Sequence, residues 1–75
     1  MEQYKNLGGS SAVSAYENGS DFIRVKFNDG SIYLYTYESA GQGNIEHMMR
    51  LAIQGQGLCT YINKAVRKAY ACKEQ

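Results

Sequence analysis

The chain has 75 residues, a formal net charge of +1 and a hydrophobic fraction of 44%. This composition is ordinary for a globular protein, and the length allows one domain with a small core, which self-association would help to stabilise. The small net charge excludes a strong overall field that would select nucleic acid or acidic partners. The polar start, Met1 to Lys5, is unlike a signal peptide, and no apolar run approaches the length of a membrane span. We therefore expect a cytoplasmic protein with no membrane partner.

Residues 1–10 are polar and end in Gly-Gly-Ser, which predicts a flexible N-terminal tail, with Tyr4 and Leu7 as the side chains that could fold back on the domain. Residues 11–16 are short and β-permissive, and the turn signal Glu-Asn-Gly-Ser-Asp follows them. We interpret them as a first strand that lies antiparallel to the next.

Residues 22–37 form the centre of the predicted sheet, a hairpin of two alternating runs around Asp29-Gly30. A two-residue loop there pairs Lys26 with Tyr33, and Arg24 with Tyr35. Because side chains alternate across a sheet, one face then carries the core residues Ile23, Val25, Phe27, Ile32 and Leu34. The other face carries Phe22, Arg24, Lys26, Tyr33, Tyr35 and Tyr37. A slip of one residue would exchange the faces, and the apolar count on the first face argues against it.

The face of cations and tyrosines has two interpretations. In the first, tyrosines are ordinary strand residues that cover the stems of opposing Lys and Arg side chains. In the second, exposed aromatic rings beside cations form a platform on which bases stack and phosphates are neutralised. Sheet pairs of this kind are common, so the first interpretation is the stronger one.

Two helices are predicted after a glycine-rich loop at residues 38–43. The first begins at Asn44 as N-cap, carries an apolar stripe at helical spacing and ends at Gly55-Gln56-Gly57. Thr60 is expected to cap the second, whose buried stripe includes Ile62, Val66 and Ala69. The fold class is therefore α+β, a three-stranded antiparallel meander packed against two C-terminal helices in the order βββαα, with residues 73–75 as a frayed end. The predicted core consists of Val13, Ile23, Val25, Phe27, Ile32, Leu34, Ile45, Met48, Met49, Ala52, Ile53, Ile62, Val66 and Ala69.

Three cations, Lys64, Arg67 and Lys68, lie near the end of the second predicted helix. A charge cluster of this kind is usually a solvated face, and it also suits the C-terminal end of a helix dipole. The alternative is a phosphate-contacting strip beside the tyrosine face.

No catalytic machinery is recognisable in the sequence. His47 is the single histidine, and a Cys59–His47 nucleophile pair would lack a third group to orient it. Cys59 and Cys72 are expected to be free thiols in a reducing compartment, a disulfide between them being the less favoured alternative. There are too few Cys and His residues for a zinc site, and the two G-x-G segments are more typical of turns than of a nucleotide loop. We expect a protein that is not an enzyme and needs no metal or cofactor.

The segment from Val25 to Tyr35 resembles the V-x-F-x-x-G-x-x-Y-x-Y centre of the KTSC domain, a small family found at the C-terminus of some lysyl-tRNA synthetases and as stand-alone bacterial proteins. Tyr61-Ile62-Asn63, followed by Val66 and Tyr70, is similar to its Y-F-N-x-x-I-x-x-x-Y ending. Ser11, Val13 and Ala52 also match. The chain departs from the family in having no proline after the tyrosine pair and a longer loop before Tyr61. The resemblance implies that residues 11–72 are one KTSC-like domain, and it suggests RNA binding, with Tyr33 and Tyr35 as the first candidates for contact.

These observations predict a small non-enzymatic binding module whose partner is RNA. The candidate contact residues are Arg24, Lys26, Tyr33, Tyr35, Lys64, Arg67 and Lys68. The alternative is a protein-interaction or self-assembly module, in the simplest case a homodimer, that uses the same tyrosine face, since tyrosine is a favoured interface residue.

Overall fold

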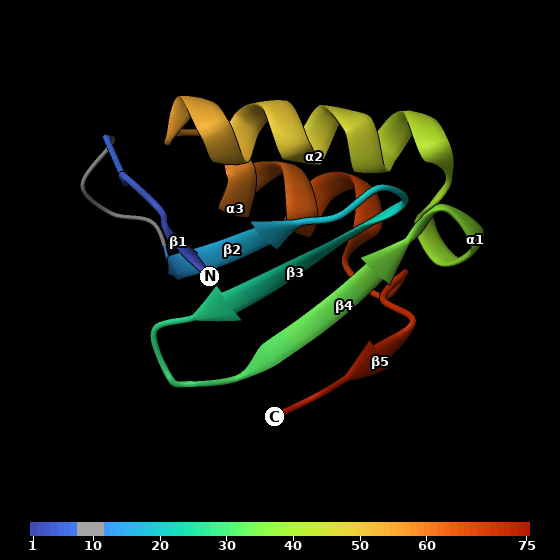
Figure 1. Ribbon diagram of the computed structural model, residues 1–75, viewed down its shortest axis with the longest axis horizontal. Helices are drawn as coiled ribbons and strands as arrows, with labels where there is room; N and C mark the ends of the chain where they lie inside the picture. The colour runs from blue at the N-terminus through green and yellow to red at the C-terminus, as the bar shows by residue number, and fades with distance from the viewer. Residues whose placement is uncertain (8–11) are drawn as a thin grey trace.

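The protein folds as a single antiparallel sheet with its helices inserted before the last strand. The computed structural model describes residues 1–7 and 12–75. The strands are β1 (Glu2–Gln3), β2 (Val13–Asn18), β3 (Phe22–Phe27), β4 (Ile32–Thr36) and β5 (Cys72–Lys73), side by side in sequence order (Figure 1). Between β4 and β5 lie α1 (Tyr37–Ala40), α2 (Gln42–Gln54), α3 (Leu58–Tyr61) and a π-helical segment, η1 (Ile62–Val66), that continues from α3.

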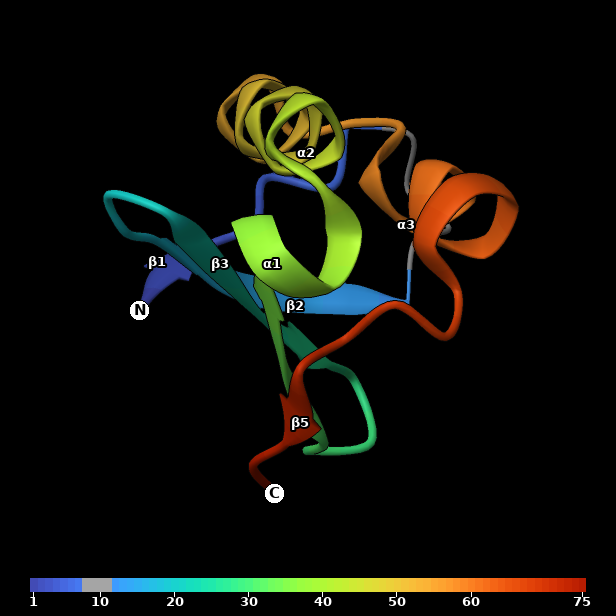
Figure 2. The ribbon, with the colours of Figure 1, turned by 90° about the vertical axis from the view of Figure 1, so that its right-hand side faces the viewer.

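The helices form one layer on one face of the sheet. Figure 2 shows α2 and α3 on the same side of the strands, and no helix of the described residues covers the other side. The predicted α+β class with an antiparallel sheet is therefore confirmed. The predicted order βββαα is not, because β1 precedes the three expected strands and β5 follows the helices. In the parts of the chain that the structure describes, every helix is too short or too polar to span a bilayer.

The predicted register of the hairpin is wrong by one residue. The structure pairs Lys26 with Ile32, Arg24 with Leu34, and Ile23 with Tyr35. The loop has three residues, 28–30, because the Phe27 N–H donates to the carbonyl of Ser31 (2.8 Å) and the Gly30 N–H donates to that of Phe27 (2.9 Å). Gly30 has a φ of 90°, as the last residue of such a loop requires. Since one residue of slip inverts a strand, β4 turns its tyrosines toward the helices.

This inversion changes the composition of the core. Tyr35 is 2% exposed and lies among the buried residues, together with Tyr4 and Leu58, none of which was predicted there. Ile32 and Leu34 were predicted in the core but lie on the outer face, partly buried. Ile53 is 59% exposed, and Phe27, Met49 and Ala69 pack on the core from its edge. The predicted core residues that are buried are Val13, Ile23, Val25, Ile45, Met48, Ala52, Ile62 and Val66.

Both ends of the chain belong to the sheet, contrary to the predicted flexible tail and frayed end. Tyr4 is 3% exposed, its N–H donates to the carbonyl of Ser14 (3.0 Å), and its hydroxyl accepts from the Leu58 N–H (3.3 Å). At the other end, the Ile32 N–H donates to the carbonyl of Gln75 (3.0 Å). The predicted tail residues 8–10 and the predicted strand residue 11 lie outside the described residues.

Helix ends follow local capping signals, some of which the sequence interpretation missed. Thr36 and Ser39 form a capping box that starts α1 at Tyr37, the last residue of the predicted hairpin, so that the helix occupies the first part of the predicted loop. Gly55 ends α2 in the left-handed region, with a φ of 83°, as predicted. Thr60 does not cap a helix, because α3 begins at Leu58 after Gly57. The helix then ends at Val66, so that Arg67 and Lys68 lie in a turn.

Candidate functional site

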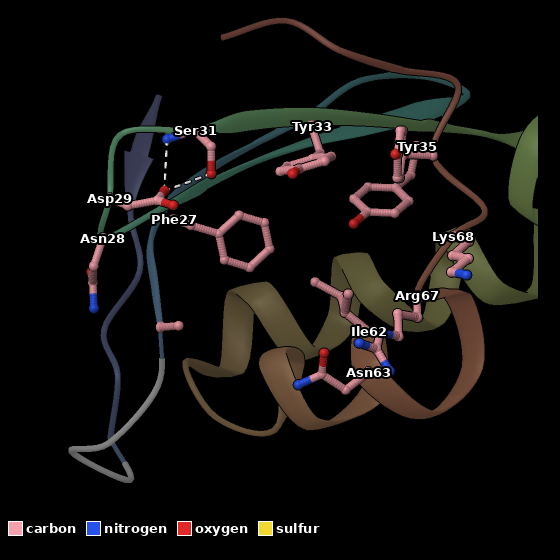
Figure 3. A pocket seen from close by; sticks show the side chains of 12 residues that line it. Phe27, Asn28, Asp29, Ser31, Tyr33, Tyr35, Ile62, Asn63, Arg67 and Lys68 are labelled. Atoms are coloured by element: carbon pink, nitrogen blue, oxygen red, sulfur yellow. Dashed lines mark hydrogen bonds between the residues drawn. The ribbon is translucent and has the colours of Figure 1, made fainter.

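A groove of about 560 Å³ lies between the β3–β4 hairpin and the helix formed by α3 and η1 (Figure 3). Its volume is within the roughly 300–1,000 Å³ typical of ligand pockets. The sheet side contributes side chains that the register inversion turned inward, and the helix side contributes residues at and just after η1. The lining residues are Ala12, Phe27, Asn28, Asp29, Ser31, Tyr33, Tyr35, Ile62, Asn63, Arg67, Lys68 and Tyr70.

Aromatic rings line the sheet side of the groove and hold one another in edge-to-face contacts. The ring centroid of Tyr33 lies 5.6 Å from that of Phe27 and 4.8 Å from that of Tyr70, and Tyr70 also meets Tyr35 at 6.3 Å. The ammonium of Lys73, from β5, lies 5.8 Å from the Tyr33 centroid. Such contacts add about 0.5–1.5 kcal/mol per aromatic pair and favour this arrangement of the rings.

Two cations at the helix end of the groove have no ion-pair partner. Arg67 and Lys68 lie next to each other at the end of η1, and neither has an acidic ion-pair partner within the described residues. Asp29 is the acidic lining residue, and its Oδ1 accepts from the N–H (2.9 Å) and the hydroxyl (2.6 Å) of Ser31. These bonds lower the pKa of Asp29, so that its carboxylate stays ionised at the hairpin end of the groove. An anion at the helix end therefore meets two cations that form no ion pair.

Burial raises the pKa of Tyr35 to about 12, with smaller contributions from Tyr33 and Tyr70. The phenol is therefore neutral in the folded protein at physiological pH. Because the unfolded phenol ionises near pH 10, the stabilising contribution of this neutral phenol is complete below pH 10 and is lost as the pH rises to about 12.

We expect the wild-type protein to lose about 2 kcal/mol more unfolding free energy than Tyr35→Phe between pH 9 and pH 12. The comparison isolates Tyr35 because the two proteins differ only in this one hydroxyl group. Urea unfolding followed by circular dichroism at the two pH values would measure it. Equal losses in the two proteins would mean that the Tyr35 phenol is open to bulk water.

The predicted site residues divide into two groups. Tyr33, Tyr35, Arg67 and Lys68 meet in the groove, whereas Arg24 and Lys26 lie on the opposite face of the sheet, and Lys64 is exposed on η1 outside the groove. The predicted face that combined Arg24 and Lys26 with the tyrosines is therefore wrong, because the three-residue loop inverts β4.

Arg24 has partners of its own on the outer face. Its guanidinium pairs with Glu74 (Nε to Oε1, 2.9 Å) and Glu17 (Nη1 to Oε1, 3.5 Å), and lies 4.8 Å from the ring centroid of Phe22. These contacts fasten β2 and the C-terminal end to β3. They also neutralise the Arg24 charge, so this residue is less suited to an anion than Arg67.

Several groove residues were not selected as site candidates. Phe27 and Ile62 were assigned to the core, and Asn63 and Tyr70 were noticed only through the family resemblance. Asn63 lies four residues before Arg67, so helical spacing would have placed Asn63 on the same helix face as this predicted cation. No short sequence pattern predicts the groove. Its existence depends on the end of η1 at Val66 and on the one-residue shift in the register of β4.

The groups considered for catalysis, His47 and Cys59, do not line the groove. The His47 ring contacts Tyr61, with centroids 4.5 Å apart, and the Cys59 sulfur accepts a weak bond from the Asn63 amide (3.8 Å). Cys59 and Cys72 are free thiols, as expected. Within residues 1–7 and 12–75, no cluster of His, Cys, Asp and Glu side chains could hold a metal ion.

No family model, curated protein or solved structure matches the chain in the three comparisons made.

Proposed function

We propose that the protein is a small non-enzymatic module that binds single-stranded RNA through the groove. The observation that carries this proposal is a groove of about 560 Å³ that is lined by aromatic rings and by two cations that form no ion pair, Arg67 and Lys68. Unpaired bases stack on aromatic rings, and their phosphates are neutralised by cations. A local cationic site of this kind does not require a strongly basic protein, which agrees with the net charge of +1.

The resemblance to the KTSC domain supports the same site and remains a proposal. Phe27, Tyr33, Tyr35, Asn63 and Tyr70 are among the positions that carry the resemblance, and all of them line the groove. We also propose a cytoplasmic location, where the two free thiols would remain reduced.

The alternative function, a protein-interaction or self-assembly module that uses the same tyrosines, has less support from the geometry. Tyr35 is 2% exposed and Tyr33 is partly buried, so these rings do not form a flat patch that a second copy could cover. A protein partner is an alternative outcome of the experiment described next.

An amide NMR titration with a pool of short single-stranded RNAs tests the proposal. We expect shifts at Phe27, Asn63 and Arg67, and none at Arg24 or Lys26 on the outer face. Neutralising two phosphates predicts a loss of about 25-fold in affinity for a tenfold rise in salt. A titration without shifts at low salt would contradict RNA binding, and a pull-down would then search for a protein partner.

A further inference from the structure

The hydroxyl group of Tyr35 is a polar group of the groove that stands at the end of a buried ring. The residue is 2% exposed, yet its hydroxyl forms no hydrogen bond with any described residue. No buried side-chain oxygen or nitrogen atom in the described residues lacks a partner, so the small exposed area of Tyr35 must include the hydroxyl oxygen. This oxygen therefore faces the groove, and Figure 3 shows it directed into the space below the sheet.

An unpaired hydroxyl at the end of a buried ring needs a partner from the groove. A phenol sealed away from water would cost about 1–3 kcal/mol, which a phenylalanine at the same position would avoid. The hydroxyl can donate to a ligand acceptor, and the ring behind it is fixed by the core. A fixed donor at the inner end of an aromatic pocket gives orientation to a planar ligand.

The other groups around this hydroxyl suit a base in the interior and a phosphate at the mouth. Figure 3 shows Phe27 on the sheet side and Ile62 on the helix side, so a planar ring between them would have apolar contacts on both faces. The amide of Asn63 and the guanidinium of Arg67 lie on the helix side of the groove. Asn63 can both donate to and accept from a base edge, and Arg67 suits a phosphate.

We propose that the groove binds one unpaired nucleotide with its base between Phe27 and Ile62, its edge at the Tyr35 hydroxyl and its phosphate at Arg67. This inference rests on the proposed function, because it identifies which part of an RNA the groove takes. A base held in this way cannot remain paired or stacked in a duplex, since its edge and both of its faces are in contact with protein. The ligand is therefore a splayed nucleotide of a single strand.

The test compares Tyr35→Phe with wild type in binding a short single-stranded RNA that carries a fluorescent 2-aminopurine. Tyr16→Phe is the matched control, because Tyr16 is likewise a β-strand tyrosine, is partly buried and does not line the groove. We expect Tyr35→Phe to weaken binding about fivefold, the effect of one hydrogen bond, while Tyr16→Phe leaves it unchanged. The blunt duplex of the same sequence is expected to bind at least tenfold more weakly than the single strand.

The outcomes separate this inference from the proposed function. If Tyr35→Phe binds the single strand like wild type, or if the duplex binds equally well, the base does not enter the groove, although RNA binding stands. If wild type binds no single-stranded RNA, both proposals fail. Free nucleoside monophosphates form a further arm: binding as tight as that of the oligomer would make a free nucleotide the ligand and would overturn RNA as its source.

Discussion

Replacing Tyr35 with alanine is expected to remove a large share of the protein's stability, whereas replacing its neighbour Leu34 is expected to have a small effect. Tyr35 is 2% exposed and packs in the core, so the loss of its ring should cost about 3–5 kcal/mol. A domain of this length has roughly 4–11 kcal/mol of stability in total. Leu34 is partly buried on the outer face, and Leu34→Ala should cost about 1 kcal/mol.

This pair of variants decides the register of the hairpin. In the two-residue loop predicted from the sequence, Leu34 faces the core and Tyr35 faces solvent, so the order of the two effects would be reversed. Urea unfolding followed by circular dichroism measures both. Tyr35→Phe is the control, because it keeps the ring and should stay within about 1 kcal/mol of wild type. A larger loss for Leu34→Ala than for Tyr35→Ala would contradict the structure.

The pattern of β4 shows why the sequence could not determine this register. In Ile-Tyr-Leu-Tyr, both alternating sets can be buried, since tyrosine is apolar along its ring and polar only at its tip. A period of two therefore establishes that the sets lie on different faces without saying which face is the inner one. The choice depends on a loop of three rather than two residues, in which Ser31 donates to the Asp29 side chain. Asp-Gly is compatible with either length.

The apolar stripe and the end of helix α2 were predicted correctly, but its start was not, because the helix begins at Gln42 after Gly41 and Asn44 lies inside it. Ile45, Met48 and Ala52 are separated by three and four residues, a spacing that fits only a helix, and Gly55 ends it in the left-handed region. The short strands β1 and β5 were missed because two residues carry no periodicity. Their pairing depends on Tyr4 in the core and on the pairing of Glu74 with Arg24, contacts between distant parts of the chain.

Part of the candidate site could be predicted and part could not. The chain offers tyrosines at 33 and 35 and cations at 67 and 68, and the structure brings these together. This is part of the arrangement that the alternative interpretation, a strip of cations beside the tyrosines, described, and Lys64 is not in it. Arg24 and Lys26 were assigned to the same face of the sheet as the tyrosines only because the predicted register was wrong. Charge alone does not distinguish Arg67 from Arg24. The difference comes from Glu17 and Glu74, which reach Arg24 from β2 and from the C-terminal end.

Reversing the charge of Arg67 is expected to weaken the binding of single-stranded RNA by at least about tenfold at low salt, whereas Lys26→Glu should change it less than about twofold. Both residues are exposed and both substitutions change the net charge by the same amount, so a general effect of charge is cancelled. Arg67 lines the groove, and Lys26 lies on the face of the sheet away from it. Fluorescence anisotropy with a labelled oligonucleotide at several salt concentrations measures both.

The salt dependence gives a second, independent measure of the same contact. Loss of one phosphate contact should reduce the slope of log affinity against log salt by about 0.7 for a single strand, and only in Arg67→Glu. If Lys26→Glu reduces affinity and slope as much as Arg67→Glu, RNA binds the open outer face of the sheet. The groove between the inverted tyrosines and the helix end would then have another ligand. A large effect confined to Arg67 would instead link RNA binding directly to the inversion of β4, since only this inversion turns the aromatic rings toward Arg67.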